Sequence, residues 1–177
     1  KGWDFNEMIC LVEESIEKIR KESGRIVKLI IDVSRSFGVD NAMKNLDLVI
    51  AKKSPHILGI GLGGDEKKGP AKEFISVFEK AVANNLHVVT HAGETCESYS
   101  MKDSINLLKA ERIGHGIQAA KDEEFMKELA EKNFPLEVCP TSNIFLLSEF
   151  NKDIKKHPVK KLYDNGDYIT INTDDPT

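Results

Sequence analysis

Cysteine is scarce in this sequence, and the three cysteines that occur form no recognisable motif. Cys10, Cys96 and Cys139 lie far apart, and no Cys-x-x-Cys pair exists. An odd number of widely spaced cysteines argues against a disulfide framework and against a structural zinc knuckle. The pattern is typical of a reducing compartment, so we expect a cytoplasmic protein.

Long apolar runs and an excess of positive charge are also absent. No stretch approaches the roughly 20 apolar residues that a membrane-spanning helix needs, and none resembles a signal sequence. The formal net charge is −4, so the chain lacks the basic field that attracts nucleic acid or an anionic membrane. We therefore expect neither as a partner, and the sequence predicts no particular oligomeric state.

The amino acids that are present suit one folded domain. Of the 177 residues, 40% are hydrophobic, which is enough for a sizeable core. No low-complexity linker divides the chain, so we expect a single domain over residues 1–177. The chain opens on Lys1 instead of Met, and we interpret it as a fragment of a longer protein.

Helix-like and strand-like patterns alternate six times along the chain. Helices are expected where apolar residues recur every three or four positions, and strands where short β-branched runs occur. The expected helices span residues 4–22, 41–52, 71–84, 101–109, 122–132 and 155–165, and the expected strands span residues 26–33, 56–62, 86–91, 111–116, 134–140 and 168–173. No Asn-Gly hairpin joins one strand directly to the next, so the alternation predicts a parallel sheet with helices outside it.

Polar residues that a core would avoid gather where the expected strands end. They are Gly63-Gly64-Asp65-Glu66 after the second strand, His91 and Glu94 at the third, His115 at the fourth, Thr141-Ser142-Asn143 after the fifth, and Asp174-Asp175 after the sixth. In a (β/α)8 barrel these carboxyl ends form the rim that holds the active site, and in an open α/β sheet they line the ligand crevice. The sequence therefore predicts its functional site at this edge.

The glycines of the segment HILGIGLGG allow two interpretations. Gly59-x-Gly61-x-x-Gly64 follows a strand and matches the dinucleotide-binding fingerprint. However, the residues KKGP separate the last glycine from the next helix, whereas a phosphate cradle needs a helix N-terminus directly there. We therefore interpret the glycines as allowing the backbone to approach a flat ligand closely. Asp65 and Glu66 are interpreted as solvated loop charges.

The remaining polar residues have simpler interpretations. His56, His87 and His157 lie at the starts of strands or of a helix, so we expect structural or surface roles for them. Arg35, after the first strand, is either part of the rim or a salt-bridge partner. Glu137 lies inside an apolar strand, so it should be buried and paired.

The residues at the strand ends suit metal-assisted hydrolysis. His91 and Asp174 offer an imidazole and a carboxylate, both of which zinc accepts as ligands, and a catalytic zinc lowers the pKa of its water to roughly 7. Glu94 would then carry a proton, His115 would act as a base or orienting group, and Asp175 would be a second, hydrogen-bonding carboxylate. Two ligands are fewer than the three that a catalytic zinc normally has, so others must come from elsewhere.

Four motifs together resemble one known family. THAGE, RIGHG, LEVCPTSN and NTDDP occur in the order and at the spacing of the adenosine deaminase family, which includes adenosine, adenine and aminodeoxyfutalosine deaminases within the amidohydrolase superfamily. The resemblance runs from about residue 26 to the end. It implies a (β/α)8 TIM barrel with one zinc ion per site, present here as units three to eight, with the first two strands and the closing helix missing. The family's His-x-His pair on the first strand does not occur in this sequence.

The resemblance also implies roles for individual residues. His91 resembles a metal-binding histidine of the family and Asp174 its metal-binding carboxylate. Glu94 resembles the acid that protonates purine N1, and His115 the histidine that orients the zinc-bound hydroxide and accepts its proton. Asp175 resembles the residue that meets the nucleophile and purine N7.

The glycine-rich segment bears on the substrate. Gly64 resembles the glycine whose backbone amide meets purine N3, whereas many adenosine deaminases have an aspartate where Gly61 stands. The resemblance favours a purine nucleoside, with zinc-dependent deamination of adenosine to inosine and ammonia. Adenine or aminodeoxyfutalosine is the alternative substrate, and a non-catalytic purine-binding fragment is the alternative class. Without the missing strands, we expect the 177 residues alone to be poorly stable and inactive.

Overall fold

One parallel sheet organises the chain. The computed structural model describes residues 4–174. Its six strands pair in chain order as β1 (Leu29–Ser34), β2 (Ile57–Gly63), β3 (His87–Ala92), β4 (Arg112–His115), β5 (Leu136–Val138) and β6 (Ile169–Ile171). All five pairings are parallel, so each strand returns to the same end of the sheet through a helical crossover. This confirms the predicted α/β class with six consecutive strand–helix units.

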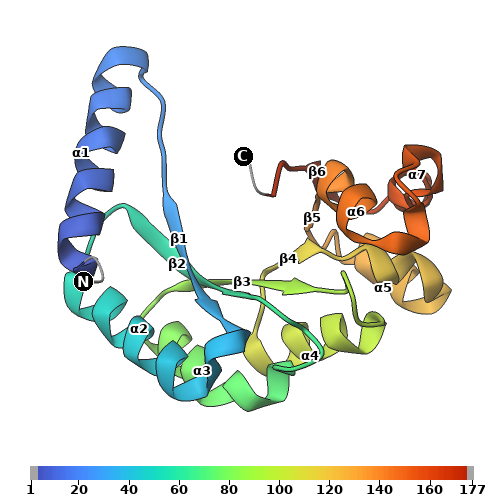
Figure 1. Ribbon diagram of the computed structural model, residues 1–177, viewed down its shortest axis with the longest axis horizontal. Helices are drawn as coiled ribbons and strands as arrows, with labels where there is room; N and C mark the ends of the chain where they lie inside the picture. Colours follow the sequence, from blue (N-terminus) through green and yellow to red (C-terminus); the bar gives the residue numbers. More distant parts are fainter. Residues whose placement is uncertain (1–3, 175–177) are drawn as a thin grey trace.

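The helices lie outside the curved sheet. They are α1 (Phe5–Ser23), α2 (Gly38–Lys52), α3 (Ile75–Ala83), α4 (Ser98–Leu108), α5 (Glu123–Glu131), α6 (Pro140–Leu146) and α7 (Val159–Asn165), with short 3-10 turns η1 (Arg35–Phe37), η2 (Ala71–Phe74), η3 (Ile117–Lys121), η4 (Ser148–Phe150) and η5 (Ile154–Lys156). In Figure 1, α2, α3 and α4 follow the outer side of the sheet, while α6 and α7 lie beside β6. Among the described residues, none of the helices combines the length and apolarity needed to span a membrane.

Local sequence signals account for the ends of α1. Asp4 caps its start, because its side chain accepts hydrogen bonds from the backbone amides of Asn6 and Glu7 at 2.9 and 3.1 Å. Gly24 ends the helix in the left-handed conformation, with φ at 70°, and its amide donates to the carbonyl of Arg20. The predicted helix at residues 4–22 is therefore confirmed to within one residue at each end.

Several boundaries differ from the prediction by a few residues, among them the starts of α4 at Ser98 and of α7 at Val159. The first strand begins at Leu29 instead of residue 26, because Ile26 is 80% exposed and the ladder starts with the bond from the Leu29 amide to the carbonyl of His56. The PTSN segment forms the start of α6, whereas the sequence placed Pro140 at the end of the fifth strand and predicted no helix after it. Pro140 stands at the first turn of this helix, a position that proline favours.

The core lies between the sheet and its outer helices. Phe74, Phe78 and Leu46 are fully buried there against Ile60 and Leu62 of β2. β2 is buried on both faces over its second half, as a strand covered by helices on one side and facing a barrel interior on the other should be.

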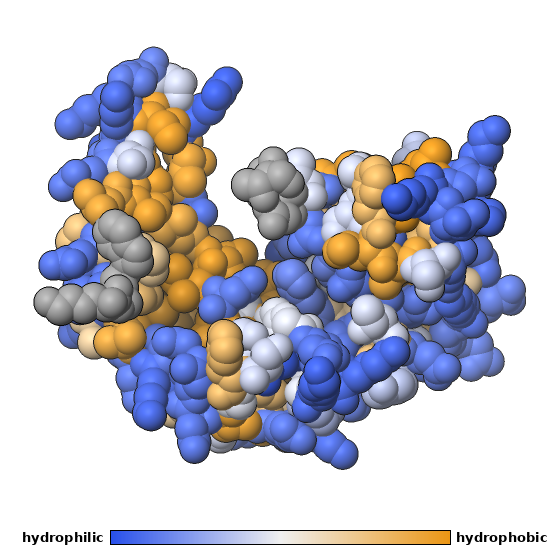
Figure 2. All heavy atoms as spheres, in the orientation of Figure 1, coloured by the Kyte–Doolittle hydropathy of each residue, from blue (hydrophilic) through white to orange (hydrophobic). Residues whose placement is uncertain are grey.

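The opposite side of the first units carries an exposed apolar face. Figure 2 shows hydrophobic residues gathered over α1 and β1 on the side that faces the hollow of the molecule. Leu11 is 55% exposed, Ile30 41% and Leu58 43%. Contiguous apolar surface of this kind normally marks a contact face of a soluble protein.

Replacing Gly59 with alanine should destabilise the fold. A Cβ at this position would lie 2.3 Å from the carbonyl oxygen of His87, so β2 and β3 would have to separate. We expect the free energy of unfolding to fall by about 1–3 kcal/mol, the usual cost of overpacking. Urea denaturation measures the change, with Val82→Ala on the exposed face of α3 as a control. An unchanged midpoint for Gly59→Ala would contradict this close approach of the strands.

Candidate functional site

Three residues from different strands meet at the carboxyl edge of the sheet. His91, His115 and Asp174 each offer one ligand atom, and these atoms lie within 4.8 Å of one another. Together with Glu137, Cys139 and Asn172 they line a cavity of about 290 Å³. The predicted metal residues His91 and Asp174 are thus brought together, and His115 lies beside them.

Two of these residues hold unusual backbone conformations. His115 and Asp174 both have φ at 67°, in the left-handed region that residues other than glycine seldom adopt. Each costs of the order of 1–3 kcal/mol and persists only where the surrounding structure enforces it. Six other non-glycine residues among those described also have positive φ, so what distinguishes His115 and Asp174 is that they share this cavity.

His115 is buried and electrically neutral. Its side chain is 2% exposed, and its ring packs edge-on against that of His91 with centroids 5.0 Å apart. Burial, together with the nearby His91, lowers the pKa of His115 to about 4. At neutral pH the ring therefore has one lone-pair nitrogen and one N–H.

Glu94 lies close enough to act with His115. Its Oε1 accepts a hydrogen bond from Asn143 Nδ2 at 3.2 Å and lies 3.7 Å from His115 Nδ1. Burial raises the pKa of Glu94, and the negative charges of Asp174 and Glu66 raise it further. The environment therefore favours the protonated carboxyl that a general acid requires.

The expectation that Glu66 is a solvated loop charge is wrong. Glu66 is 5% exposed, and its carboxylate accepts hydrogen bonds from the backbone amides of residues 93–96 at 2.7–3.1 Å. The hydroxyls of Thr95 and Ser100 also donate to it, at 3.1 and 2.8 Å. Burial alone would raise the pKa of Glu66, but these donors outweigh burial and lower it.

Arg35 holds the same segment from the other side. Its guanidinium donates to the carbonyl oxygens of His91 and Gly69, both at 2.6 Å, and the residue is 3% exposed. Of the two roles left open by the sequence, the structure places Arg35 at the rim through backbone carbonyls. Glu137 is partly buried and paired with Arg112 at 2.6 Å, as expected.

Asp32 is a site residue that the sequence did not reveal. Its Oδ2 lies 4.0 Å from His91 Nε2, and its side chain is 54% exposed at the edge of the site. Asp32 pairs with Gly61 in the β1–β2 ladder, and a Cβ at Gly61 would lie 1.6 Å from Asp32 Oδ1. Gly61 thus makes room for this carboxylate. An acid inside the apolar run LIIDV was the signal available.

His157 lies beside the site, deeper than a surface role would imply. It is 4% exposed and its Nε2 lies 3.2 Å from Asn143 Oδ1. The other two histidines pair with carboxylates away from the site, His56 with Glu17 and His87 with Glu111. The sequence placed Asn143 at the rim without assigning it a role, and it is fully buried there.

Of the two predicted substrate-binding residues, the structure describes Gly64. Gly64 is exposed at the rim with φ at 90°, and a Cβ there would lie 2.9 Å from Ser34 Oγ, so the position requires glycine. Contact between its amide and a substrate stays a prediction. Asp175 lies outside the described residues, and its role stays a prediction as well.

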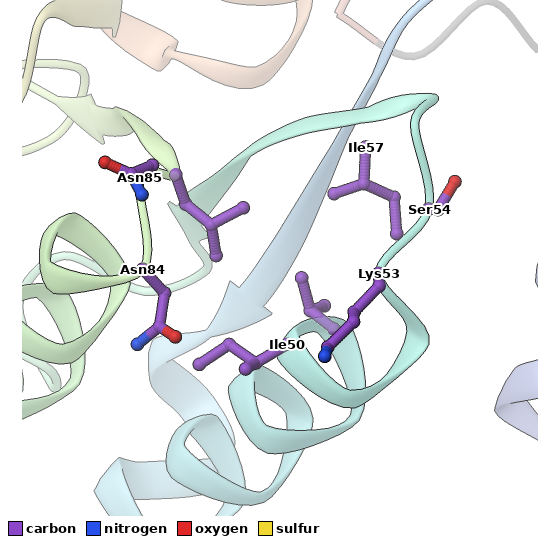
Figure 3. A pocket seen from close by; sticks show the side chains of 8 residues that line it. Ile50, Lys53, Ser54, Ile57, Asn84 and Asn85 are labelled. Atoms are coloured by element: carbon purple, nitrogen blue, oxygen red, sulfur yellow. The ribbon is translucent and has the colours of Figure 1, made fainter.

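Another cavity lies at the amino ends of the strands. It has a volume of about 340 Å³ and is lined by Ile50, Lys53, Ser54, Ile57, Asn84 and Asn85 among others (Figure 3). The described residues that line it include no carboxylate, imidazole or thiol. It therefore offers neither metal ligands nor an acid–base pair.

Comparison with known proteins agrees with this geometry. The family model of adenosine deaminase matches residues 1–177. An adenine deaminase of Rhizobium rhizogenes is 35% identical over 165 residues, covering 93% of this chain and 51% of that protein. An aminodeoxyfutalosine deaminase of Streptomyces avermitilis is 34% identical over 178 residues, covering 99% of this chain and 49% of that protein. The chain thus spans about half the length of the curated relatives it matches.

Solved structures share the fold. The crystal structure of adenine deaminase from Arthrobacter aurescens matches with a TM-score of 0.87 and 30% identity, over 93% of this chain and 50% of that one. An amidohydrolase from Burkholderia ambifaria with bound Zn matches with a TM-score of 0.91 and 24% identity, over 99% of this chain and 49% of that one. The six units are therefore the counterpart of half of an amidohydrolase barrel. The chain belongs to the adenosine deaminase family.

Replacing Glu66 with glutamine should destabilise the protein in a pH-dependent way. The amide would set an NH2 against buried N–H groups, and leaving such groups unsatisfied costs about 1–3 kcal/mol. The lowered pKa of Glu66 means that its stabilisation is full above the ordinary glutamate pKa, roughly 4.3, and is lost as pH falls through the lowered value. Denaturant titrations of both proteins across this range measure the difference.

Asp65→Asn is the matched control for this experiment. Asp65 carries the same charge on the same loop but is half-exposed and pairs with Lys68. We expect its replacement to change the unfolding free energy by less than about 0.5 kcal/mol. Equal effects at both positions would refute the buried role of Glu66.

Proposed function

We propose that the full-length protein removes the 6-amino group of a purine by hydrolysis, with adenine as its substrate. The observation that carries this proposal is that Glu94, a partly buried carboxyl with a raised pKa, lies close to His115 and to the potential metal ligands His91 and Asp174. A hydrolytic deaminase needs these parts, because a proton must reach the ring while water attacks the carbon that carries the amine. Family membership supports the same chemistry.

The donor set fits a zinc ion. His91 and Asp174 supply an imidazole and a carboxylate on one side of the cavity, and both are ligand types that zinc accepts. A zinc ion held there would lower the pKa of a water molecule and so provide a nucleophile at neutral pH. We propose that one zinc ion binds per site, and that ligands other than His91 and Asp174 complete its coordination.

Four residues of this chain have distinct proposed roles in the reaction. Glu94, whose pKa is raised by burial, is proposed to donate a proton to the ring nitrogen N1, which weakens the aromatic system and makes C6 electrophilic. His115 would orient the attacking water oxygen, which adds to C6. One proton of the water would replace the one that Glu94 gave up, and the other would pass to the amino group, which leaves as ammonia. The backbone amide of Gly64 and the carboxylate of Asp175 are proposed to hold the purine ring through N3 and N7.

The relatives support adenine and aminodeoxyfutalosine better than the adenosine favoured by the motifs. An adenine deaminase of Crocosphaera subtropica is 39% identical over 99% of this chain, and the aminodeoxyfutalosine deaminase named above covers the same share. Adenine is the first candidate and aminodeoxyfutalosine the second, since both share the 6-aminopurine ring that these residues would contact.

A substrate panel tests the proposed function. Ammonia release by the full-length protein with zinc should be fastest on adenine, followed by aminodeoxyfutalosine, and slower on adenosine. The 177 residues alone should show no turnover, because His91 and Asp174 are fewer ligands than the three of a typical catalytic zinc site. Binding of purines without release of ammonia from any of the three would favour a non-catalytic role instead.

Replacing Glu94 with glutamine should abolish turnover while purine binding and zinc content persist. General acid–base catalysis contributes roughly 10²–10⁴-fold, so kcat should fall by that factor. In the unmodified protein, kcat should fall as pH rises through the raised pKa of Glu94, since only the protonated acid can donate. Glu97→Gln, an exposed acid in the same segment, is the control. A near-normal rate in Glu94→Gln would remove Glu94 from the mechanism.

Replacing Asp174 with alanine should lower the metal content itself. The substitution removes a proposed metal ligand and not a proton donor, so the purified variant should contain less zinc than the unmodified protein. Elemental analysis of the purified variant measures the zinc stoichiometry. A full complement of zinc in Asp174→Ala would show that other groups hold the metal.

A further inference from the structure

We infer that His157 and Asn143 are positioning residues, which orient His115 as an N–H donor toward the cavity and join it to Glu94. The inference deepens the proposed function and rests on it for its catalytic meaning. The orientation itself follows from a chain of hydrogen bonds that begins at the backbone.

The first step fixes the proton on His157. The backbone amide of Val159 lies 3.1 Å from His157 Nδ1 and donates to it. A ring nitrogen that accepts a hydrogen bond carries no proton, so the proton of the neutral ring is on Nε2. Burial lowers the pKa of His157, which keeps the ring neutral.

The second step fixes the amide of Asn143. His157 Nε2 lies 3.2 Å from Asn143 Oδ1, and because this nitrogen bears the proton, it donates to that oxygen. Asn143 is fully buried, so its amide group depends on protein partners for its hydrogen bonds. The oxygen therefore faces His157 and the NH2 group faces the opposite way, toward the candidate site.

The third step fixes the proton on His115. The NH2 group of Asn143 lies 3.2 Å from Glu94 Oε1 and 3.1 Å from His115 Nδ1, and it can donate one hydrogen to each. His115 Nδ1 therefore accepts, and the proton of the neutral ring is on Nε2. A metal binds a ring nitrogen only through its lone pair, so His115 in this tautomer donates to an oxygen in the cavity and does not bind the metal.

The same NH2 group also orients the general acid. Because Glu94 Oε1 accepts from Asn143, the proton of the neutral carboxyl resides on Oε2, the oxygen left free for the substrate. A single amide thus sets the direction of both groups, the acid that would protonate the ring and the imidazole that would orient the attacking oxygen. Misdirecting either group lowers the rate without removing any reacting atom.

Nitrogen NMR of the imidazole rings tests the orientation directly. In full-length protein with 15N-labelled histidine, long-range correlations distinguish Nε2–H from Nδ1–H rings. We expect the Nε2–H form for His157 and His115. A His115 ring protonated on Nδ1 would overturn the inference, whether or not the protein deaminates purines.

Variants at position 157 separate positioning from folding. His157→Leu removes the donor to Asn143, so the amide can rotate, and we expect mixed His115 tautomers and a kcat about tenfold lower with KM and zinc content unchanged. His157→Gln keeps an N–H donor and should restore most of the rate. His87→Leu, at an exposed histidine paired with Glu111, is the control and should leave both readouts unchanged. Unaltered tautomer and kcat in folded His157→Leu would overturn the inference.

A substitution at position 143 tests the inference even if His157→Leu does not fold. Asn143→Asp is nearly isosteric but only accepts, so it should draw the proton of His115 onto Nδ1. A shift of the His115 ring to the Nδ1–H form supports the inference, and retention of Nε2–H refutes it. If the unmodified protein shows no deaminase activity, the proposed function fails, while the tautomers still decide whether His157 and Asn143 orient the ring.

Discussion

The candidate site depends on one buried negative charge. Glu66 gathers four consecutive backbone amides of residues 93–96 around its carboxylate, and Arg35 holds the carbonyl of His91 from the other side. A buried carboxylate is tolerated only when donors surround it, so the turn after β3 and the loop after β2 stabilise each other. This contact fixes the backbone that carries both His91 and Glu94. Without this contact, His91, the proposed metal ligand, and Glu94, the proposed acid, would lie on a turn that is free to change its conformation.

The parallel sheet supplies the rest of the geometry. The last residues of each strand lie at the same edge, so side chains separated by 21 residues or more in the sequence meet within a few ångströms. The left-handed backbone at His115 and Asp174 then turns these residues at the points where their strands end. The sheet determines where the residues meet, and the local strain determines how they are directed.

The sequence predicted the helices and strands well, because periodicity is a local signal. The strand-end residues His91, His115 and Asp174 do lie together at one edge, as expected from their positions. The sequence prediction failed where a residue's environment depends on distant donors. Glu66 looks like a surface charge beside glycines and lysines, and its partners lie 27 or more residues further along the chain. Asp32 was missed for the same reason, since its neighbour in space, His91, is remote in sequence. The burial of His157 agrees with the structural role expected for it, but its contact with Asn143 was not predicted.

The fit between Asp32 and Gly61 has a consequence for the history of the family. The carboxylate of Asp32 on β1 occupies the space that a side chain at position 61 on β2 would fill. Only one of the two positions can therefore carry a large side chain. A substitution that enlarges position 61 is tolerable only after position 32 has become small, and the reverse holds as well. Related sequences should therefore have changed at both positions together, with an acid carried by one strand or by its neighbour but not by both.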